Sequence, residues 1–159
     1  MCLIVDNSVR DRVFFNADDR DFRLLHYCLF GNGRTAVRIV YGGELKREYL
    51  LRKEVMHRLL ELDRKGQARI VSDAKVDEET EALKRSGLCR SNDAHVIALA
   101  RIGKVGLLCA DDKALKRDFR NKALIDRPRG KVYNRKSHEN LLRQFCGGST
   151  TRRLRKRSK

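Results

Sequence analysis

The stretch that most constrains the fold lies at residues 106–113, where a short apolar run ends in two adjacent carboxylates, Asp111 and Asp112. An apolar run of this length without alternation is typical of a parallel strand covered on both faces. The pattern also occurs near the N-terminus, because apolar residues 3–5 run directly into Asp6. Open α/β sheets bind ligands at the carboxyl ends of their strands. The sequence therefore predicts an α/β fold with a functional site at that edge, although either acid alone could equally be a helix N-cap.

Apolar strands and amphipathic helices alternate along most of the chain. We expect strands at residues 3–5, 36–41, 69–71, 106–110 and 132–133, and helices at 8–15, 17–30, 44–64, 77–86, 92–102, 114–121 and 137–145. In the longest helix, helical spacing places Glu44 on the face of Leu51, Val55 and Leu59, which would turn Glu44 toward the core. Glu48 and Glu54 are expected to face solvent or to form ion pairs.

Three smaller features carry expectations of their own. Asp18, Asp19 and Asp21 are predicted to form a solvated first helical turn that the helix dipole favours, and not a metal site. The four histidines are scattered singly, so a zinc site is not expected. The five cysteines show no CxxC pairing and are interpreted as small buried hydrophobic residues of a reducing compartment.

Length and charge set the domain organisation. The 159 residues fit one domain at 1–146, followed by a basic, disordered arm at 147–159. Neither a signal peptide nor a membrane-spanning run is expected, which favours a cytoplasmic protein without a membrane partner. The net charge of +16 points to a polyanionic partner, with nucleic acid first. The residues expected to bind nucleic acid through the arm are Arg152, Arg153, Arg155, Lys156, Arg157 and Lys159.

Four acids stand at element boundaries that face the predicted carboxyl edge of the sheet. They are Asp6, Glu44, Asp93 and Asp111, with Asp112 beside the last. Two carboxylates 4 Å apart repel each other by about 4 kcal/mol at an effective dielectric near 20. A fold that gathers them therefore needs a hard divalent cation, and Mg²⁺ or Mn²⁺ suits carboxylate and water ligands. Such an ion can activate a water nucleophile for attack on a phosphate.

Four segments occur in a fixed order along the chain, at residues 4–6 with Ser8, 43–45, 92–94 with 97–100, and 107–111. Together they resemble the four acidic motifs of PIN-domain nucleases, over about residues 2–125. The resemblance implies a three-layer α/β/α sandwich with a central, mostly parallel sheet and a metal-dependent endonuclease that usually cuts RNA. It also implies that Asp6, Glu44, Asp93 and Asp111 are catalytic and metal-binding acids.

Two positions refine the resemblance. Ser8 matches a small polar residue that follows the first acid of the family, whereas Cys109 stands where the family often has Thr or Ser. Either Asp111 or Asp112 is the fourth acid, and the sequence leaves both assignments open. Small bacterial members of similar size commonly act as toxins, so an antitoxin-like inhibitor and a homodimer are implied as partners.

Two other functions compete with the nuclease. One is a non-catalytic nucleic-acid-binding module that keeps the fold and uses only its basic surface, although all four acids are present. The other is a signalling domain of receiver type, which also gathers acids around Mg²⁺ at a sheet edge. That class expects its acidic pair after the first strand, but here the pair follows a late strand.

Overall fold

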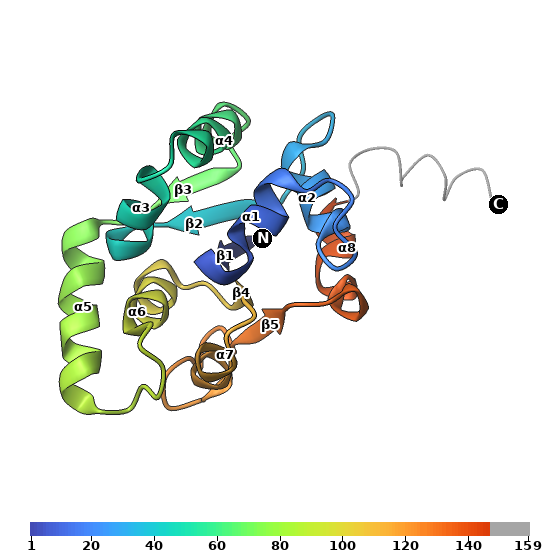
Figure 1. Cartoon of the computed structure of the whole chain (residues 1–159). Helices are drawn as coiled ribbons and strands as arrows, with labels where there is room; N and C mark the ends of the chain where they lie inside the picture. Colours follow the sequence, from blue (N-terminus) through green and yellow to red (C-terminus); the bar gives the residue numbers. More distant parts are fainter. Residues whose placement is uncertain (147–159) are drawn as a thin grey trace.

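A five-stranded, all-parallel sheet forms the centre of the molecule (Figure 1). The structure is a computed structural model that describes residues 1–146, so the predicted basic arm lies outside the described residues. The strand order is β3-β2-β1-β4-β5, which places β1 in the middle. The strands are β1 (Cys2–Val5), β2 (Arg38–Tyr41), β3 (Ala68–Ile70), β4 (Leu107–Cys109) and β5 (Lys131–Tyr133). The predicted α/β fold class is confirmed.

Helices cover both faces of the sheet (Figure 1). α1, α2, α4 and α8 lie on one side, α5 and α6 pack against each other on the other side, and α3 touches both α4 and α6. The helices are α1 (Asn7–Phe15), α2 (Arg23–Phe30), α3 (Gly43–Leu50), α4 (Lys53–Arg64), α5 (Asp73–Ser86), α6 (Ala94–Gly103), α7 (Lys113–Arg120) and α8 (Asn140–Cys146), with a 3-10 turn at Lys136–His138. No helix within residues 1–146 is both long and apolar enough to cross a membrane.

The neighbouring strands β1 and β4 are apolar because both of their faces are covered. Ile4 pairs with Leu108 and Val5 pairs with Cys109, and all four side chains are fully buried. The chain leaves both strands at the same edge of the sheet, and the N–H of Asp6 donates to the carbonyl of Cys109 at 2.9 Å. This edge is also where the following helices begin, so it collects helix N-termini, whose partial positive charge favours carboxylates.

The helix predicted at residues 44–64 is interrupted. α3 ends at Leu50, Arg52 has an extended backbone (φ −114°, ψ 121°), and α4 begins at Lys53. Leu51 is 84% exposed, and α3 buries Leu45 and Tyr49 instead. The predicted inward face is confirmed for Val55 and Leu59, which are buried, and was wrong for Glu44 and Leu51, because it assumed one continuous helical phase. The predicted helix at residues 17–30 is likewise shorter, since α2 begins only at Arg23.

The start of α3 is set by a glycine and an aspartate. Gly43 has a φ of +58°, and a Cβ at this position would lie 2.7 Å from Cγ1 of Val76, so only glycine fits. The N–H of Gly43 donates to Asp73 Oδ1 at 2.8 Å, and Lys46 Nζ donates to Asp73 Oδ2 at 2.5 Å. Asp73 at the start of α5 thus holds the first turn of α3, which carries Glu44.

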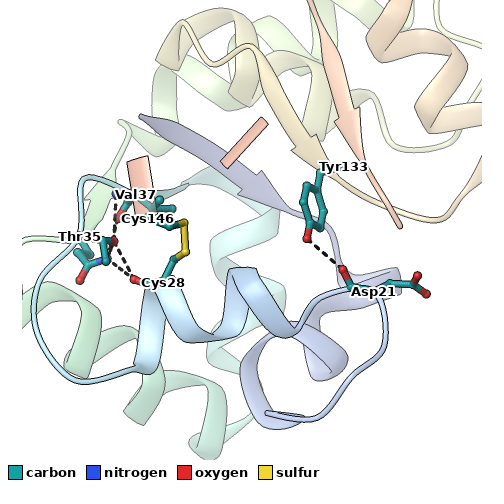
Figure 2. Close-up of a disulfide and its surroundings, with 7 residues drawn as sticks. Asp21, Cys28, Thr35, Val37, Tyr133 and Cys146 are labelled. Atoms are coloured by element: carbon teal, nitrogen blue, oxygen red, sulfur yellow. Dashed lines mark hydrogen bonds between the residues drawn. A yellow bond between two sulfur atoms is a disulfide. The ribbon is translucent and has the colours of Figure 1, made fainter. Parts of the chain in front are cut away.

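A disulfide joins α2 to the C-terminal end of the described chain. Cys28 in α2 is bonded to Cys146 at the end of α8 (Figure 2). The prediction that all five cysteines are unpaired was therefore wrong for these two. Their separation of 118 residues left no spacing signal, because the pairing follows from the packing of α8 against α2. Cys2 and Cys89 are half-buried and Cys109 is buried, all as free thiols.

Asp73 predicts a pH dependence of stability. The hydrogen bond from Lys46 lowers the pKa of the Asp73 carboxyl below its usual value, and the Gly43 N–H lowers it further. Its contribution to stability is therefore present above the unfolded pKa of about 3.9 and is lost as pH falls through the folded pKa. We expect Asp73→Asn to cost about 0.5–1 kcal/mol at pH 7, because the pair is partly exposed, and nearly nothing at pH 2. Urea unfolding at both pH values measures this.

A matched control is Asp77→Asn, which removes only the exposed ion pair with Arg47. It should cost less than Asp73→Asn at pH 7. A cost of Asp73→Asn that stays constant between pH 7 and pH 2 would contradict the electrostatic explanation.

Candidate metal centre

Asp6 lies at the centre of the carboxyl edge. It follows β1 directly and is only 6% exposed. The carboxylate of Asp6 accepts two hydrogen bonds, both at Oδ2. The N–H of Ser8 donates one at 3.1 Å, and the hydroxyl of Ser8 donates the other at 2.6 Å. Among the described residues, Oδ1 of Asp6 accepts no hydrogen bond. Ser8 thus orients this nearly buried carboxylate through Oδ2, and Oδ1 can bind a metal ion.

The hydroxyl of Ser8 also reaches the exit of β4. Its Oγ accepts the N–H of Asp111 at 3.1 Å while it donates to Asp6. At the end of β4 itself, burial raises the pKa of the Cys109 thiol and keeps it neutral. Ser8 thus supplies the hydroxyl that connects the first and fourth acidic segments.

Glu44, Glu48 and His95 form a group that can hold a metal ion. One ligand atom from each lies within 4.8 Å of the others. Oε2 of Glu44 is 3.6 Å from Nδ1 of His95, and Oε2 of Glu48 is 3.7 Å from Nε2 of the same ring. The imidazole is 6% exposed and forms no hydrogen bond within the described residues. Glu48 was predicted to face solvent or to pair with Lys or Arg; its side chain is 32% exposed and lies beside His95 instead, because Glu48 lies one turn beyond Glu44 on the same face of α3.

Neighbouring side chains fix the position of Glu48. The side-chain amide of Asn7 donates to Glu48 Oε2, and Nη1 of Arg10 donates to Asn7 Oδ1 at 2.8 Å. Burial raises the pKa of Glu48, the charge of His95 opposes this rise, and the charge of Glu44 adds to it. Asn7, which directly follows Asp6, thus orients the carboxylate of Glu48 on α3. The exit of β1 and helix α3 therefore belong to one site.

Asp93 lies at the N-cap of α6 without capping it, since its side chain accepts no hydrogen bond from that helix. Burial raises the pKa of the Asp93 carboxyl, and the charges of Asp6, Asp112 and Glu44 raise it further, against the opposing charge of His95. Three acids from separate segments therefore act electrostatically on a fourth. This is the repulsion that a divalent cation would relieve.

Asp111 and Asp112 have different surroundings. The Asp111 carboxylate is 60% exposed and lies 3.7 Å from Nζ of Lys116. Asp112 caps α7, with its Oδ1 accepting the N–H of Leu115 at 2.8 Å. The backbone of Asp111, by contrast, is tied to Ser8.

The donor set fits a divalent cation. Mg²⁺ and Mn²⁺ prefer carboxylate and water oxygens. Within residues 1–146, the ligand atoms that come within 4.8 Å of one another are those of Glu44, Glu48 and His95, and Asp6, Asp93 and Asp111 are not part of that group. Imidazole nitrogen suits transition metals such as Zn²⁺, which bind at about 2.0–2.2 Å. One ring can place only one nitrogen on a given ion, so the second nitrogen of His95 would face the remaining glutamate and orient the ring. Of the four acids predicted to bind metal, this described group contains Glu44.

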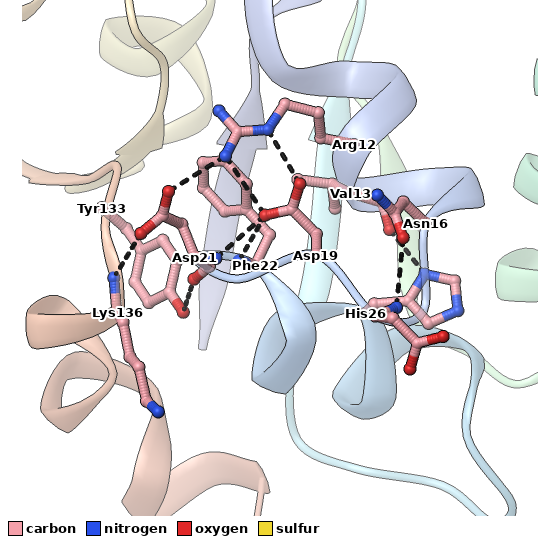
Figure 3. Close-up of polar contacts among 10 residues, drawn as sticks. Arg12, Val13, Asn16, Asp19, Asp21, Phe22, His26, Tyr133 and Lys136 are labelled. Atoms are coloured by element: carbon pink, nitrogen blue, oxygen red, sulfur yellow. Dashed lines mark hydrogen bonds and ion pairs between the residues drawn. The ribbon is translucent and has the colours of Figure 1, made fainter.

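The acids at residues 18–21 have a structural role instead. Asp19 is 7% exposed, so the prediction of a solvated turn was wrong for it. Its Oδ2 accepts from Arg12 Nε at 2.9 Å, and its Oδ1 accepts the N–H groups of Asp21 and Phe22 (Figure 3). Burial would raise the pKa of Asp19, but these hydrogen bonds lower it below its usual value. Arg12 also pairs with Asp21, so two carboxylates of this cluster share one guanidinium of the chain itself.

Comparison with protein-family models, with curated proteins and with solved structures gave no match. The likeness to PIN-domain nucleases is therefore carried by the ordered acidic segments and by the α/β fold with its five-stranded parallel sheet.

His95 generates the first prediction about the site. We expect His95→Asn to lower the affinity for Zn²⁺ by at least about tenfold, because it removes the only nitrogen donor of the described group. The affinity for Mg²⁺ should change little, because oxygen ligands bind it. Thermal melts of EDTA-treated protein against each metal measure both affinities, since a ligand of the folded state raises Tm.

His57→Asn is the matched control, because His57 is exposed on α4. It should leave both metal responses unchanged. An unaltered Zn²⁺ response in His95→Asn would remove His95 from the site.

Proposed function

We propose that this chain is a divalent-metal-dependent endonuclease that hydrolyses phosphodiester bonds, with RNA as its substrate and Mg²⁺ or Mn²⁺ as its cofactor. One observation carries the proposal. Asp93 occupies a helix N-cap, is half-buried and lies in the field of Asp6, yet its carboxylate caps nothing. The acids assigned to the metal are Asp6, Glu44, Asp93 and Asp111, with Asp112 as an outer helper.

Asp93 stands at the N-cap of α6 but does not stabilise that helix with a capping hydrogen bond. An N-cap aspartate typically stabilises its helix by about 1 kcal/mol through a hydrogen bond to a free N–H. Asp6 and Asp112, at the starts of α1 and α7, both form that bond. Asp93 does not, and its carboxyl has a raised pKa beside other acids. A carboxylate that gives up its cap while crowding its neighbours is better explained by a ligand than by folding.

The chain's own residues suit this chemistry. Ser8 holds Asp6 through Oδ2, and among the described residues Oδ1 accepts no hydrogen bond. Asn7 and His95 hold Glu48, which keeps α3 against the exit of β1. A bound divalent cation would supply an activated water and neutralise charge on the attacked phosphate. The hydroxyl of Tyr49 donates a hydrogen bond to the carbonyl of Val5. This bond fixes α3, the helix that carries Glu44 and Glu48.

The excess of basic residues supports a polyanionic substrate. The net charge of +16 makes the chain attractive to nucleic acid as a whole. RNA, a toxin role and an antitoxin-like inhibitor enter the proposal from the family resemblance alone.

A second function has one observation in its favour. Oδ2 of Asp6 and Oε2 of Glu48 are already hydrogen-bonded by Ser8 and Asn7, so the fold holds these acids without an ion. A non-catalytic nucleic-acid-binding module would need no more than this. The assay of cleavage separates the two functions.

The main prediction is that cleavage depends on metal and on two acids. Purified protein incubated with tRNA, rRNA or single-stranded DNA should cut RNA in Mg²⁺ or Mn²⁺ and stop in EDTA. Asp6→Asn and Asp93→Asn should each lower the rate by at least about a hundredfold, because each removes a charged ligand of the ion. Gel analysis of the products measures the rate.

Asp18→Asn is the control, because Asp18 is an exposed acid outside the site. It should cut at the wild-type rate, and thermal melts should show that all three variants fold. Undiminished cleavage in EDTA by a verified metal-free preparation would refute the proposal. Binding without cleavage in any metal would favour the non-catalytic module.

A further prediction separates Asp111 from Asp112. We expect Asp111→Asn to reduce cleavage more than Asp112→Asn, because Asn caps a helix about as well as Asp. Asp112→Ala should instead cost about 1 kcal/mol of stability by removing the cap of α7. Cleavage assays and urea unfolding measure the two effects. The reverse ranking of the two Asn variants would make Asp112 the fourth acid of the metal site.

A further inference from the structure

A cavity of about 570 Å³ opens between α7 and the loop that precedes α6. Asp118 lines it together with Asn121. Its wall also carries five cationic side chains, which we call the α7 cationic pocket: Arg90, Lys113, Lys116, Arg117 and Arg120.

Helical spacing gathers four of these cations. Positions 113, 116, 117 and 120 follow one another at i, i+3, i+4 and i+7, so they lie along one side of α7. Leu115 and Phe119 point the other way and are fully buried. At 1.5 Å per residue the row is about 10 Å long, which exceeds the rise of about 3.4 Å per nucleotide in a duplex strand. The row is therefore long enough to face more than one phosphate.

The fifth cation is held in place by a buried acid. Asp118 is 2% exposed, and its carboxylate accepts the N–H of Arg90 at 3.0 Å and the N–H of Ser91 at 2.9 Å. The charge of Asp118 is thus directed at backbone donors of the loop. This arrangement fixes the backbone of Arg90 opposite α7 and also braces the loop that leads into Asp93.

Most of the positive charge in the pocket is unpaired. Within residues 1–146 only Lys116 among the five cations forms an ion pair, with Asp111 at 3.7 Å. Burial lowers the pKa of the nearby His138, and the charges of Arg135, Arg120 and Lys116 lower it further, as expected in a positive field. Lys116 belongs both to the pocket and to the exit of β4, so the pocket adjoins the acid edge directly.

We propose that the α7 cationic pocket binds backbone phosphates of a nucleic-acid strand next to the phosphate that reaches the acid edge. This rests on the proposed nuclease function for the position of the cut, but not for the binding itself. Arginine forks bind phosphate oxygens in bidentate fashion, and such contacts position a strand without reading its sequence. The pocket therefore sets where the strand lies relative to the metal centre.

The test measures binding without catalysis. Full-length protein in EDTA is titrated against a short fluorescein-labelled oligouridylate across a range of salt concentrations. Arg117→Ala/Arg120→Ala should weaken binding about tenfold near physiological salt and lower the salt slope by about 1.4, at about 0.7 per lost phosphate contact on a single strand. The variant should fold, because both side chains are exposed. Arg117→Lys/Arg120→Lys should restore the salt slope, since charge is retained, but only part of the affinity, because lysine lacks the bidentate fork.

The matched control is Lys53→Ala/Arg64→Ala, which removes the same charge from exposed positions on α4. It should change affinity less than twofold. Equal losses of affinity in both double variants would overturn the proposal that the pocket binds phosphates. Unchanged affinity and salt slope in the Arg117→Ala/Arg120→Ala variant would also overturn it. So would a selective loss of binding to anionic phospholipid vesicles with oligouridylate binding intact. If no metal supports cleavage but the α7 variant alone loses binding, the nuclease function fails and the pocket stands.

Discussion

The structure depends on a concentration of negative charge at one edge of its sheet. In a parallel sheet with β1 at the centre, the chain must leave β1 and β4 side by side, and each exit carries an aspartate. The fold tolerates this because the same edge collects helix N-termini and their N–H groups. Ser8 makes the arrangement specific, because one hydroxyl donates to Asp6 and accepts from the backbone of Asp111. Asp93 occupies an N-cap position at this edge, but its carboxylate forms no capping hydrogen bond with α6.

The third helix shows how the fold transmits order to this edge. Its start requires Gly43 at positive φ and the Asp73 carboxylate, and its buried face is tied to the carbonyl of Val5 through Tyr49. These contacts rotate Glu44 and Glu48 toward His95 rather than into the core. A glutamate that the helical pattern assigned to the interior is therefore available to a ligand. The break after α3 is what allows the two helices to bury different faces.

Much of the fold could be predicted from the sequence, because strands that end in carboxylates and uniformly apolar strands are local signals. The site was predictable in part. Of the described group that can hold a metal ion, Glu44 was predicted from its position at an element boundary. Asp6 and Asp93 were predicted in the same way, and the charges of Asp6 and Glu44 raise the pKa of Asp93. Glu48 had a usable signal, since it lies four residues after Glu44. His95 had none, because its partners come from another helix. The Cys28 disulfide was missed for the same reason.

The distribution of charge also bears on how a nucleic acid could approach. Phosphates and carboxylates repel each other, so a strand cannot settle on the acid edge through that edge alone. Immediately beside that edge, α7 carries cations that form no ion pair with any residue of the described part of the chain, and Lys116 joins the two regions by its ion pair with Asp111. A strand held by its flanking phosphates loses much of its freedom before the reacting phosphate meets the acids, which lowers the entropic cost of positioning it. The adjacency of opposite charges at the exit of β4 is thus a physical requirement of the proposed chemistry, and it follows from a single helix that begins at an acid and continues as a row of cations.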